Sequence, residues 1–158
     1  MEIEKKYLVE ELPEDLAHYD KSELEQCYLC AEPTIRARKS DDSYILTYKS
    51  RKVTEEKEAL NISEELEVPL NAEAYAHLKE KADGICIVKT RYRIPYGKYQ
   101  IELDVFHGEY EGFCLAEVEF PSVEEGRLFT PPSWFGKDVS GDFHYTNSYL
   151  SSHSPSEI

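Results

Sequence analysis

The sequence is poor in basic side chains and lacks any long apolar run. Its 158 residues carry 18 Lys and Arg against 32 Asp and Glu, which gives a formal net charge of -14. DNA, RNA and anionic lipid surfaces are bound through an excess of basic groups, so we expect no nucleic acid and no membrane as partners. No stretch approaches the roughly eighteen apolar residues that a transmembrane helix needs. A local cluster of bases can still bind a small anionic ligand.

Signals for export and for several common site types are also missing. Met1 is followed directly by the charged residues Glu2, Glu4, Lys5 and Lys6, so we expect no secretory signal and a cytoplasmic location. The five histidines are scattered and show no H-E-x-x-H spacing. No G-x-S-x-G, P-loop or G-x-G-x-x-G motif occurs. The sequence therefore gives no sign of the nucleophile turn of an α/β-hydrolase or of a glycine-rich nucleotide-binding loop.

The cysteines are few: Cys27, Cys30, Cys86 and Cys114. Cys27 and Cys30 form a lone C-x-x-C, without a second pair or a nearby histidine, in a segment that reads as a strand. Residues three apart on a regular strand point to opposite faces. We therefore expect four reduced, mostly buried thiols rather than a zinc or redox site.

Alternating apolar and polar residues dominate what is present. They predict eight strands, at residues 2–9, 24–31, 33–39, 43–49, 62–68, 85–94, 98–106 and 113–120. A helix is expected at 71–82 with Asn71 as its N-cap, and shorter helices around 13–17 and at 144–151. The proline-containing segment 121–142 reads as an ordered crossing loop anchored by Trp134 and Phe135, and the charged stretch 50–58 reads as a solvated loop. The chain length fits one α+β domain, residues 1–151, with a frayed tail over 152–158.

Seven of the predicted strands carry an ionic face opposite a largely apolar one. An antiparallel sheet with one solvated face gives the same alternation. Two features favour a special role for the ionic faces. Charges arrive as doublets of like sign at i and i+2, and like charges on one face repel unless an opposite partner or a ligand lies between them. Arginine is also favoured in these doublets, and its guanidinium suits bidentate phosphate recognition.

An eight-stranded barrel has an interior that holds side chains or one small ligand. If the ionic faces point inward, the bases inside are Lys6, Arg36, Arg38, Lys49, Lys89 and Arg91, with Arg93 as a further candidate, and the acids are Glu2, Glu4, Glu65, Glu67, Glu102, Asp104, Glu117 and Glu119. Burying so many charges without a ligand is costly. A polyphosphate with a divalent metal suits such a lumen, because bases bind phosphate oxygens and carboxylates bind a hard cation. The periodicity alone leaves open which way the charges point.

Several motifs, in order along the chain, resemble the CYTH superfamily, the triphosphate tunnel metalloenzymes. The first is E-x-E-x-K at Glu2–Lys6. The others are QCYL at 26–29, IRAR at 35–38, LTYK at 46–49, ELEVP at 65–69, VKTRY at 88–92, IELDVF at 101–106, LAEVEF at 115–120 and WFGKDVSGD at 134–142. The resemblance covers about residues 2–150 and is strongest to the short, single-domain bacterial members.

The resemblance implies a closed eight-stranded antiparallel β-barrel, with a charged tunnel inside and helices packed on the outside. It implies Mg²⁺ or Mn²⁺ as cofactor and assigns roles by position. Substrate-binding residues would be Lys6, Tyr28, Arg36, Arg38, Lys49, Lys89 and Arg91. Metal-binding residues would be Glu2, Glu4, Asp104, Glu117 and Glu119, and the catalytic set would be Glu4, Lys6, Asp104 and Glu119. Glu65, Glu67, Glu102 and Arg93 receive no firm role.

The implied function is metal-dependent hydrolysis of inorganic triphosphate, or a related linear triphosphate, to diphosphate and phosphate. Three alternatives stay open: a class IV-type adenylyl cyclase, a nucleoside or thiamine triphosphatase, and a non-catalytic polyphosphate-binding module. The chain departs from the family at Cys27, Ile101 and His144, which we expect to tune substrate shape. The expected partner is a small anionic triphosphate, and the size class favours a homodimer.

Overall fold

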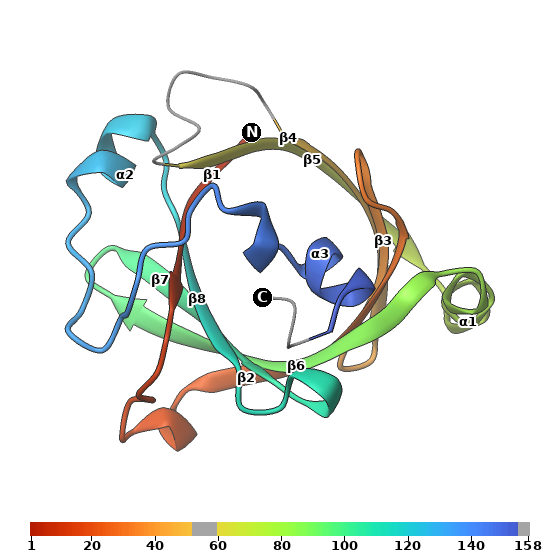
Figure 1. Cartoon of the computed structure of the whole chain (residues 1–158), viewed down its shortest axis with the longest axis horizontal. Coiled ribbons are helices and arrows are strands. Elements are labelled where there is room, and N and C mark those ends of the chain that lie inside the picture. Colours follow the sequence, from red (N-terminus) through yellow and green to blue (C-terminus); the bar gives the residue numbers. More distant parts are fainter. Residues whose placement is uncertain (52–59, 155–158) are drawn as a thin grey trace.

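The computed structural model describes residues 1–51 and 60–154. In these residues eight antiparallel strands close into a barrel in the order β1-β5-β4-β3-β2-β6-β7-β8 (Figure 1). The strands are β1 Glu2–Leu8, β2 Asp20–Cys30, β3 Thr34–Ser40, β4 Ser43–Arg51, β5 Asn61–Leu70, β6 Asp83–Tyr96, β7 Tyr99–Phe106 and β8 Cys114–Glu119. The predicted strands and the predicted closed barrel are confirmed.

The strand register brings the ionic residues of neighbouring strands together. Lys6 on β1 pairs with Glu117 on β8, and Lys49 on β4 pairs with Glu65 on β5. Because side chains alternate along a strand, one face of the whole barrel wall is ionic and the other apolar. The charged side chains point into the barrel, as expected, which answers the question that periodicity left open.

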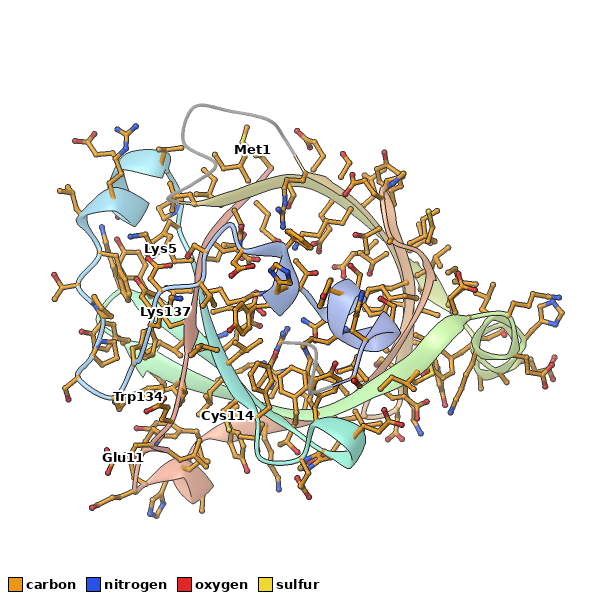
Figure 2. The ribbon with its side chains drawn as sticks, in the orientation of Figure 1. Met1, Lys5, Glu11, Cys114, Trp134 and Lys137 are labelled. Atoms are coloured by element: carbon orange, nitrogen blue, oxygen red, sulfur yellow. A yellow bond between two sulfur atoms is a disulfide. The ribbon has the colours of Figure 1, made fainter. Side chains whose placement is uncertain are left out.

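The apolar face of the wall is covered from outside. Ile101, Leu103 and Val118 are fully buried there. Trp134 and Phe135 pack against this cluster, in agreement with the predicted anchoring role of this pair. The segment that follows them runs beside β1, where the Leu8 amide donates to the carbonyl oxygen of Lys137 over 2.9 Å. Figure 2 labels Lys137 on this segment.

Two helices lie outside the barrel, and the first of them is the helix predicted at 71–82. Helix α1, Ala72–Glu80, packs against β3 and β4, and its N-cap Asn71 accepts a hydrogen bond from the Ala74 amide at 2.8 Å. Helix α2, Val123–Leu128, corrects the prediction of a loop over the whole of 121–142. It forms because Ser122 caps it by accepting from the Glu125 amide at 3.2 Å, in an S-x-x-E pattern.

The C-terminal helix α3, Asn147–Ser152, has a different place: it lies within the ring of strands (Figure 1). It packs on β6 and β2, and Leu150 is fully buried. The approach to β6 is close at Gly84, where a Cβ atom would collide with the carbonyl oxygen of Ser151 and where φ is +63°. The prediction that helices pack on the outside therefore holds for α1, while the helix predicted at 144–151 corresponds to α3 and lies inside the ring of strands. Short 3-10 helices occupy Leu16–His18, Gly108–Tyr110 and Phe143–Tyr145.

The expectation of four reduced cysteines is wrong for one pair. Cys27 and Cys86 form a disulfide between β2 and β6, with Cα atoms 4.5 Å apart, while Cys30 and Cys114 are free thiols. A β-bulge explains the pairing: the register of β2 with β6 shifts between Gln26 and Tyr28, so Cys27 does not follow the regular ladder. Its partner is 59 residues away in sequence and comes close only in the closed barrel.

Some predictions fall on residues that the structure does not describe. The acidic run Glu55, Glu56 and Glu58 and the last residues of the predicted tail, 155–158, lie outside the described ranges. Within those ranges, no helix has the length and apolar character needed to cross a membrane.

Candidate active site

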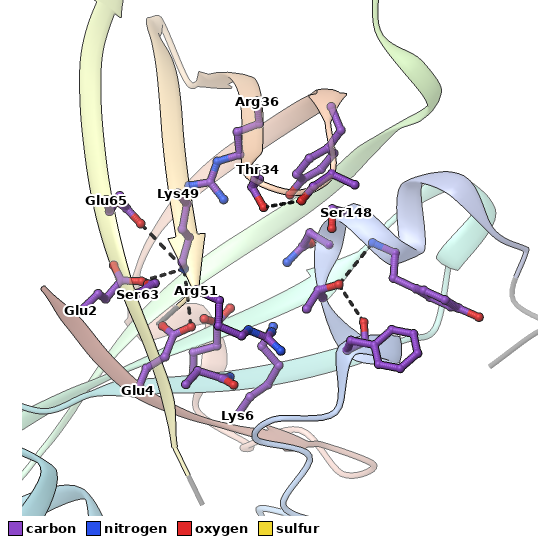
Figure 3. Close-up of a pocket in the computed structure, with 18 of the residues that line it drawn as sticks. Glu2, Glu4, Lys6, Thr34, Arg36, Lys49, Arg51, Ser63, Glu65 and Ser148 are labelled. Carbon is purple, nitrogen blue, oxygen red and sulfur yellow. Dashed lines mark hydrogen bonds and ion pairs between the residues drawn. The ribbon is translucent and has the colours of Figure 1, made fainter. Parts of the chain in front are cut away.

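A cavity of about 600 Å³ lies between the inner barrel wall and the C-terminal segment (Figure 3). Basic side chains line it from four strands: Lys6, Arg36, Arg38, Lys49, Arg51 and Arg91. Carboxylates line it as well: Glu2, Glu4, Glu32, Glu65, Glu67, Glu102, Glu117 and Glu119. Tyr28 completes the set expected from the sequence. Of the residues given a role there, Lys89 and Asp104 are the two that are buried in the wall and do not line the cavity.

Lys49 connects the basic and acidic sides of the cavity. Its Nζ lies 2.7 Å from Oε1 of Glu2, 3.8 Å from Oε1 of Glu4 and 3.7 Å from Oε2 of Glu65 (Figure 3). Burial alone would lower the pKa of Lys49, but Glu4 and Glu2 outweigh it and raise that pKa above its ordinary value. This wall therefore holds a cation among carboxylate oxygens in the folded protein.

Glu4 and Glu117 form a second acidic feature, with each residue less than a tenth exposed. Burial and the neighbouring Glu117 raise the pKa of Glu4 well above its usual range. Burial opposes ionisation of Glu117 too, but Lys6 and Arg91 outweigh it and hold the pKa of Glu117 well below its usual range. Carboxylates crowded in this way are stabilised by a proton or by a cation between them.

The donor chemistry of this wall fits a hard divalent cation. Mg²⁺ and Mn²⁺ prefer oxygen ligands, and Glu2, Glu4, Glu117 and Glu119 supply carboxylates from the adjacent strands β1 and β8. Across the described residues, no group of three or more acidic, histidine or cysteine side chains is already gathered around one point. The wall thus offers the right ligand atoms, with Lys49 and Lys6 as the cations that now balance them.

Asp104 sits at the centre of a buried ion-pair cluster. Arg91 donates to it twice, from Nε to Oδ1 at 2.8 Å and from Nη2 to Oδ2 at 2.9 Å, and Lys89 Nζ lies 2.7 Å from Oδ2. Lys89 and Asp104 are fully buried. Burial lowers the pKa of Lys89 to about 7. It opposes ionisation of Asp104 as well, but Arg91 and Lys89 outweigh it and keep the pKa of Asp104 below its ordinary value.

Arg36 is a base that lacks a hydrogen-bond acceptor for one of its nitrogen atoms. It is nine-tenths buried, and its Nε has no hydrogen-bond partner among the described residues. An unpartnered buried N–H of a charged group is costly, and phosphate oxygens are acceptors that suit a guanidinium. Arg36 lines the cavity, so its guanidinium group is placed to meet an anion bound there.

Sequence reasoning missed three contributors to this site. Arg51 lines the cavity; the signal was present, because Arg51 follows Lys49 at i+2, but the predicted strand ended at residue 49. Gln26 is fully buried beside Tyr28 and Arg38, and a neutral residue does not stand out in a search for charge. Arg93, which received no firm role from the sequence, is not one of these contributors: it does not line the cavity, and its Nη2 donates to the hydroxyl oxygen of Ser22 at 2.5 Å.

The third contributor is the C-terminal segment, whose place is set by contacts distant in sequence. Lys6 Nζ donates to the carbonyl oxygen of Tyr145 at 3.1 Å, and Lys89 Nζ donates to Oδ1 of Asn147 at 3.0 Å. Asn147 and Ser148 also line the cavity. Two of the expected phosphate-binding lysines are thus held by oxygen atoms of this segment.

A closed barrel with a lumen of opposed basic and acidic walls defines the class of protein, and comparisons with known proteins agree. The CYTH domain family model matches residues 1–129. The chain belongs to the CYTH domain family. It is 35% identical over 155 residues to an inorganic triphosphatase of Nitrosomonas europaea, covering 94% of this chain and 95% of that protein. It is 31% identical over 150 residues to an inorganic triphosphatase of Acetivibrio thermocellus, covering 94% and 92%.

Solved structures show the same relationship. The crystal structure of an inorganic triphosphatase, 31% identical, superposes with a TM-score of 0.71 and covers 98% of this chain and 97% of that one. A structure from Hippeastrum, 17% identical with a TM-score of 0.60, covers 81% of this chain and 83% of that one, and shares the fold.

Proposed function

We propose that this protein hydrolyses inorganic triphosphate, or a closely related linear triphosphate, to diphosphate and phosphate with the help of Mg²⁺ or Mn²⁺. The observation that carries the proposal is the cavity that Arg36 and five further bases line, in which Arg36 is nine-tenths buried and has no partner for its Nε among the described residues. A compact polyanion supplies acceptors for all of them. The relatives named inorganic triphosphatase, which match this chain over almost its whole length, support the same reaction.

Binding falls to the basic residues that face the cavity. Arg36, Arg38 and Arg91 present guanidinium groups from β3 and β6, and Lys6 and Lys49 present ammonium groups from β1 and β4. Phosphoryl transfer depends mainly on positioning and on neutralising charge, and bases distributed around a linear triphosphate provide both.

The buried cluster holds part of this set in place. Because both oxygens of Asp104 are already bound by Arg91 and Lys89, we assign Asp104 to fixing these two bases rather than to binding a metal. Removing Asp104 would leave two buried cations without their partner, which is strongly destabilising.

The carboxylates on β1 and β8, which we call the acidic wall, would bind the metal and position the attacking water. Glu2, Glu4, Glu117 and Glu119 would hold the divalent ion, which when bound neutralises phosphate charge and activates water. Glu119 is less enclosed than Glu4 and Glu117, and its carboxylate is the one we assign to orient a water molecule and accept its proton. The water oxygen forms the new P–O bond to the terminal phosphorus, and the bridging P–O bond breaks with diphosphate as the leaving group.

A parallel product assay tests this function. Inorganic triphosphate, ATP and thiamine triphosphate are offered with Mg²⁺ and, separately, with Mn²⁺, and phosphate, diphosphate and cyclic AMP are measured. We expect phosphate and diphosphate from inorganic triphosphate at a higher kcat/KM than for ATP. Cyclic AMP and diphosphate from ATP would make the protein a cyclase, and tight triphosphate binding without turnover would make it a binding module.

A further inference from the structure

Gln26 lies beneath the cavity wall and contacts two residues that line it. Its side chain is fully buried on β2, next to Tyr28 at i+2 and opposite Arg38 on β3 in the strand register. Arg38 Nε donates to Oε1 of Gln26 at 2.8 Å, and Nε2 of Gln26 donates to the hydroxyl oxygen of Tyr28 at 2.8 Å. Gln26 itself does not line the cavity.

The chemistry of the two neighbours fixes the orientation of the amide. The Nε–H of Arg38 can only donate, so the amide oxygen must face Arg38 and the NH₂ group must face Tyr28. The Tyr28 hydroxyl therefore accepts from Gln26. Its own proton is left to donate elsewhere, and Tyr28 lines the cavity.

The neutral charge of Gln26 matters for Arg38. The guanidinium of Arg91 is matched by both oxygens of Asp104, so its charge is balanced within the protein. Arg38 is held by a neutral amide instead, which orients the guanidinium through Nε and leaves its positive charge and its terminal nitrogens for an anion. Burial, with Arg36 and Arg91 nearby, lowers the pKa of Arg38 to about 9, as expected for a base whose charge is not offset.

We propose that Gln26 is a positioning residue for triphosphate binding and hydrolysis: its amide orients Arg38 without neutralising it and directs the hydroxyl proton of Tyr28 into the cavity. The inference rests on the proposed function for the identity of the anion. It goes beyond that function by giving a role to a residue that touches neither substrate nor metal.

The decisive variant is Gln26→Glu, which keeps the side-chain shape but reverses both effects. A carboxylate at this place would neutralise Arg38 and would accept the Tyr28 proton, turning it away from the cavity. We expect triphosphate binding, measured by calorimetry without metal, to weaken about tenfold to a hundredfold. We expect kcat to fall as well, with a melting temperature close to that of the wild type. The exposed Gln100→Glu serves as the matched control for an added charge.

A double-mutant cycle adds a readout that general loss of packing would not produce. Gln26→Leu removes both hydrogen bonds, and Tyr28→Phe removes the hydroxyl alone. In the Tyr28→Phe background, Gln26→Leu should lower kcat by a smaller factor than it does in the wild type, because the hydrogen bond between Gln26 and Tyr28 is already missing.

These results test the role of Gln26 separately from the proposed hydrolysis of triphosphate. Wild-type binding of triphosphate by Gln26→Glu, or losses that simply multiply in the cycle, would overturn the role of Gln26. A wild type that binds triphosphate without hydrolysing it would refute the proposed function, while the calorimetry on Gln26→Glu would still decide this proposal. A wild type that fails to bind triphosphate would overturn both.

Discussion

The ammonium nitrogen of Lys49 lies 2.7 Å from Oε1 of Glu2, so a base on β4 reaches an acid on β1 past the intervening strand β5. The two residues belong to opposite parts of the proposed chemistry, since one would bind phosphate and the other metal. A metal–triphosphate complex would satisfy both groups with new partners. The pair therefore marks where substrate and cofactor are expected to meet.

Replacing Lys49 should weaken substrate binding. Lys49→Ala removes a charged donor from the cavity and leaves Glu2, Glu4 and Glu65 without their shared cation. We expect KM for triphosphate to rise about tenfold to a hundredfold, the range for loss of a hydrogen bond to a charged group. Steady-state kinetics provides the measurement. Lys39→Ala, an exposed lysine of β3, should leave KM unchanged, and an unchanged KM for Lys49→Ala would remove Lys49 from the substrate site.

Glu4→Gln should abolish turnover and leave the barrel intact. Gln occupies the same volume on β1 but cannot carry the negative charge that a divalent cation needs. We expect kcat to fall by about a hundredfold or more, as for loss of a metal ligand. Far-ultraviolet circular dichroism and a thermal melt check the fold. The exposed Glu14→Gln is the control, and near-normal activity of Glu4→Gln would show that Glu4 does not bind the metal.

Removing divalent cations should stop the reaction reversibly. The acidic wall provides oxygen ligands without a histidine or cysteine in the predicted metal set, so excess chelator is expected to strip the ion completely. Activity should return when Mg²⁺ or Mn²⁺ is added in excess. Full activity in chelator would rule out a metal role for Glu2, Glu4, Glu117 and Glu119 together.

The disulfide should stabilise the barrel. Cys27 and Cys86 close a loop with a sequence separation of 59, so Cys27→Ser should lower the free energy of unfolding by about 2–4 kcal/mol. Urea unfolding under non-reducing conditions measures the difference. Cys30→Ser, at a free thiol, is the control. Equal stability of wild type and Cys27→Ser would show that the bridge does not form in solution.

Stability should fall in acid through Glu25. This carboxylate accepts from the Tyr75 hydroxyl at 2.7 Å and from Lys79 at 3.0 Å, which joins β2 to α1. Burial would raise the pKa of Glu25, but Tyr75 and Lys79 outweigh it and lower the pKa below the ordinary 4.5. A lowered pKa in the folded state stabilises the fold above the unfolded-state pKa, and that contribution disappears as the pH falls through the folded-state pKa.

The measurement compares wild type with Glu25→Gln by urea unfolding at two pH values. The wild type should be the more stable at pH near 7, and the gap should shrink at a pH of about 3, below the ordinary carboxyl pKa. A gap that stays constant or widens in acid would contradict the assigned shift.

Much of the barrel was predictable because its signal is local. The alternation in β1, β3 and β8 is present in the sequence, and the like-charged doublets indicated an unusual face. The direction of that face came from the resemblance, since alternation is the same for a barrel that points its charges outward. The N-cap of α1 at Asn71 was also predictable, because the capping hydrogen bond joins residues only three apart in the sequence.

What escaped prediction depends on contacts between distant residues or on uncharged groups. The Cys27–Cys86 bridge needs a bulge and a closed barrel, and α3 enters the lumen through contacts with β6. Gln26 is neutral and so gave no charge signal. Helix α2 is different: the Ser122 and Glu125 capping pattern is present in the sequence, but the prolines and glycines of the same segment favour a loop.

The most direct test of the central claim is phosphorus NMR of inorganic triphosphate incubated with the wild-type protein and Mg²⁺. The account predicts disappearance of the triphosphate signals with diphosphate and phosphate appearing in equal amounts, and no reaction by Glu4→Gln. Triphosphate that stays intact with both Mg²⁺ and Mn²⁺, under conditions where calorimetry shows it bound, would contradict the account.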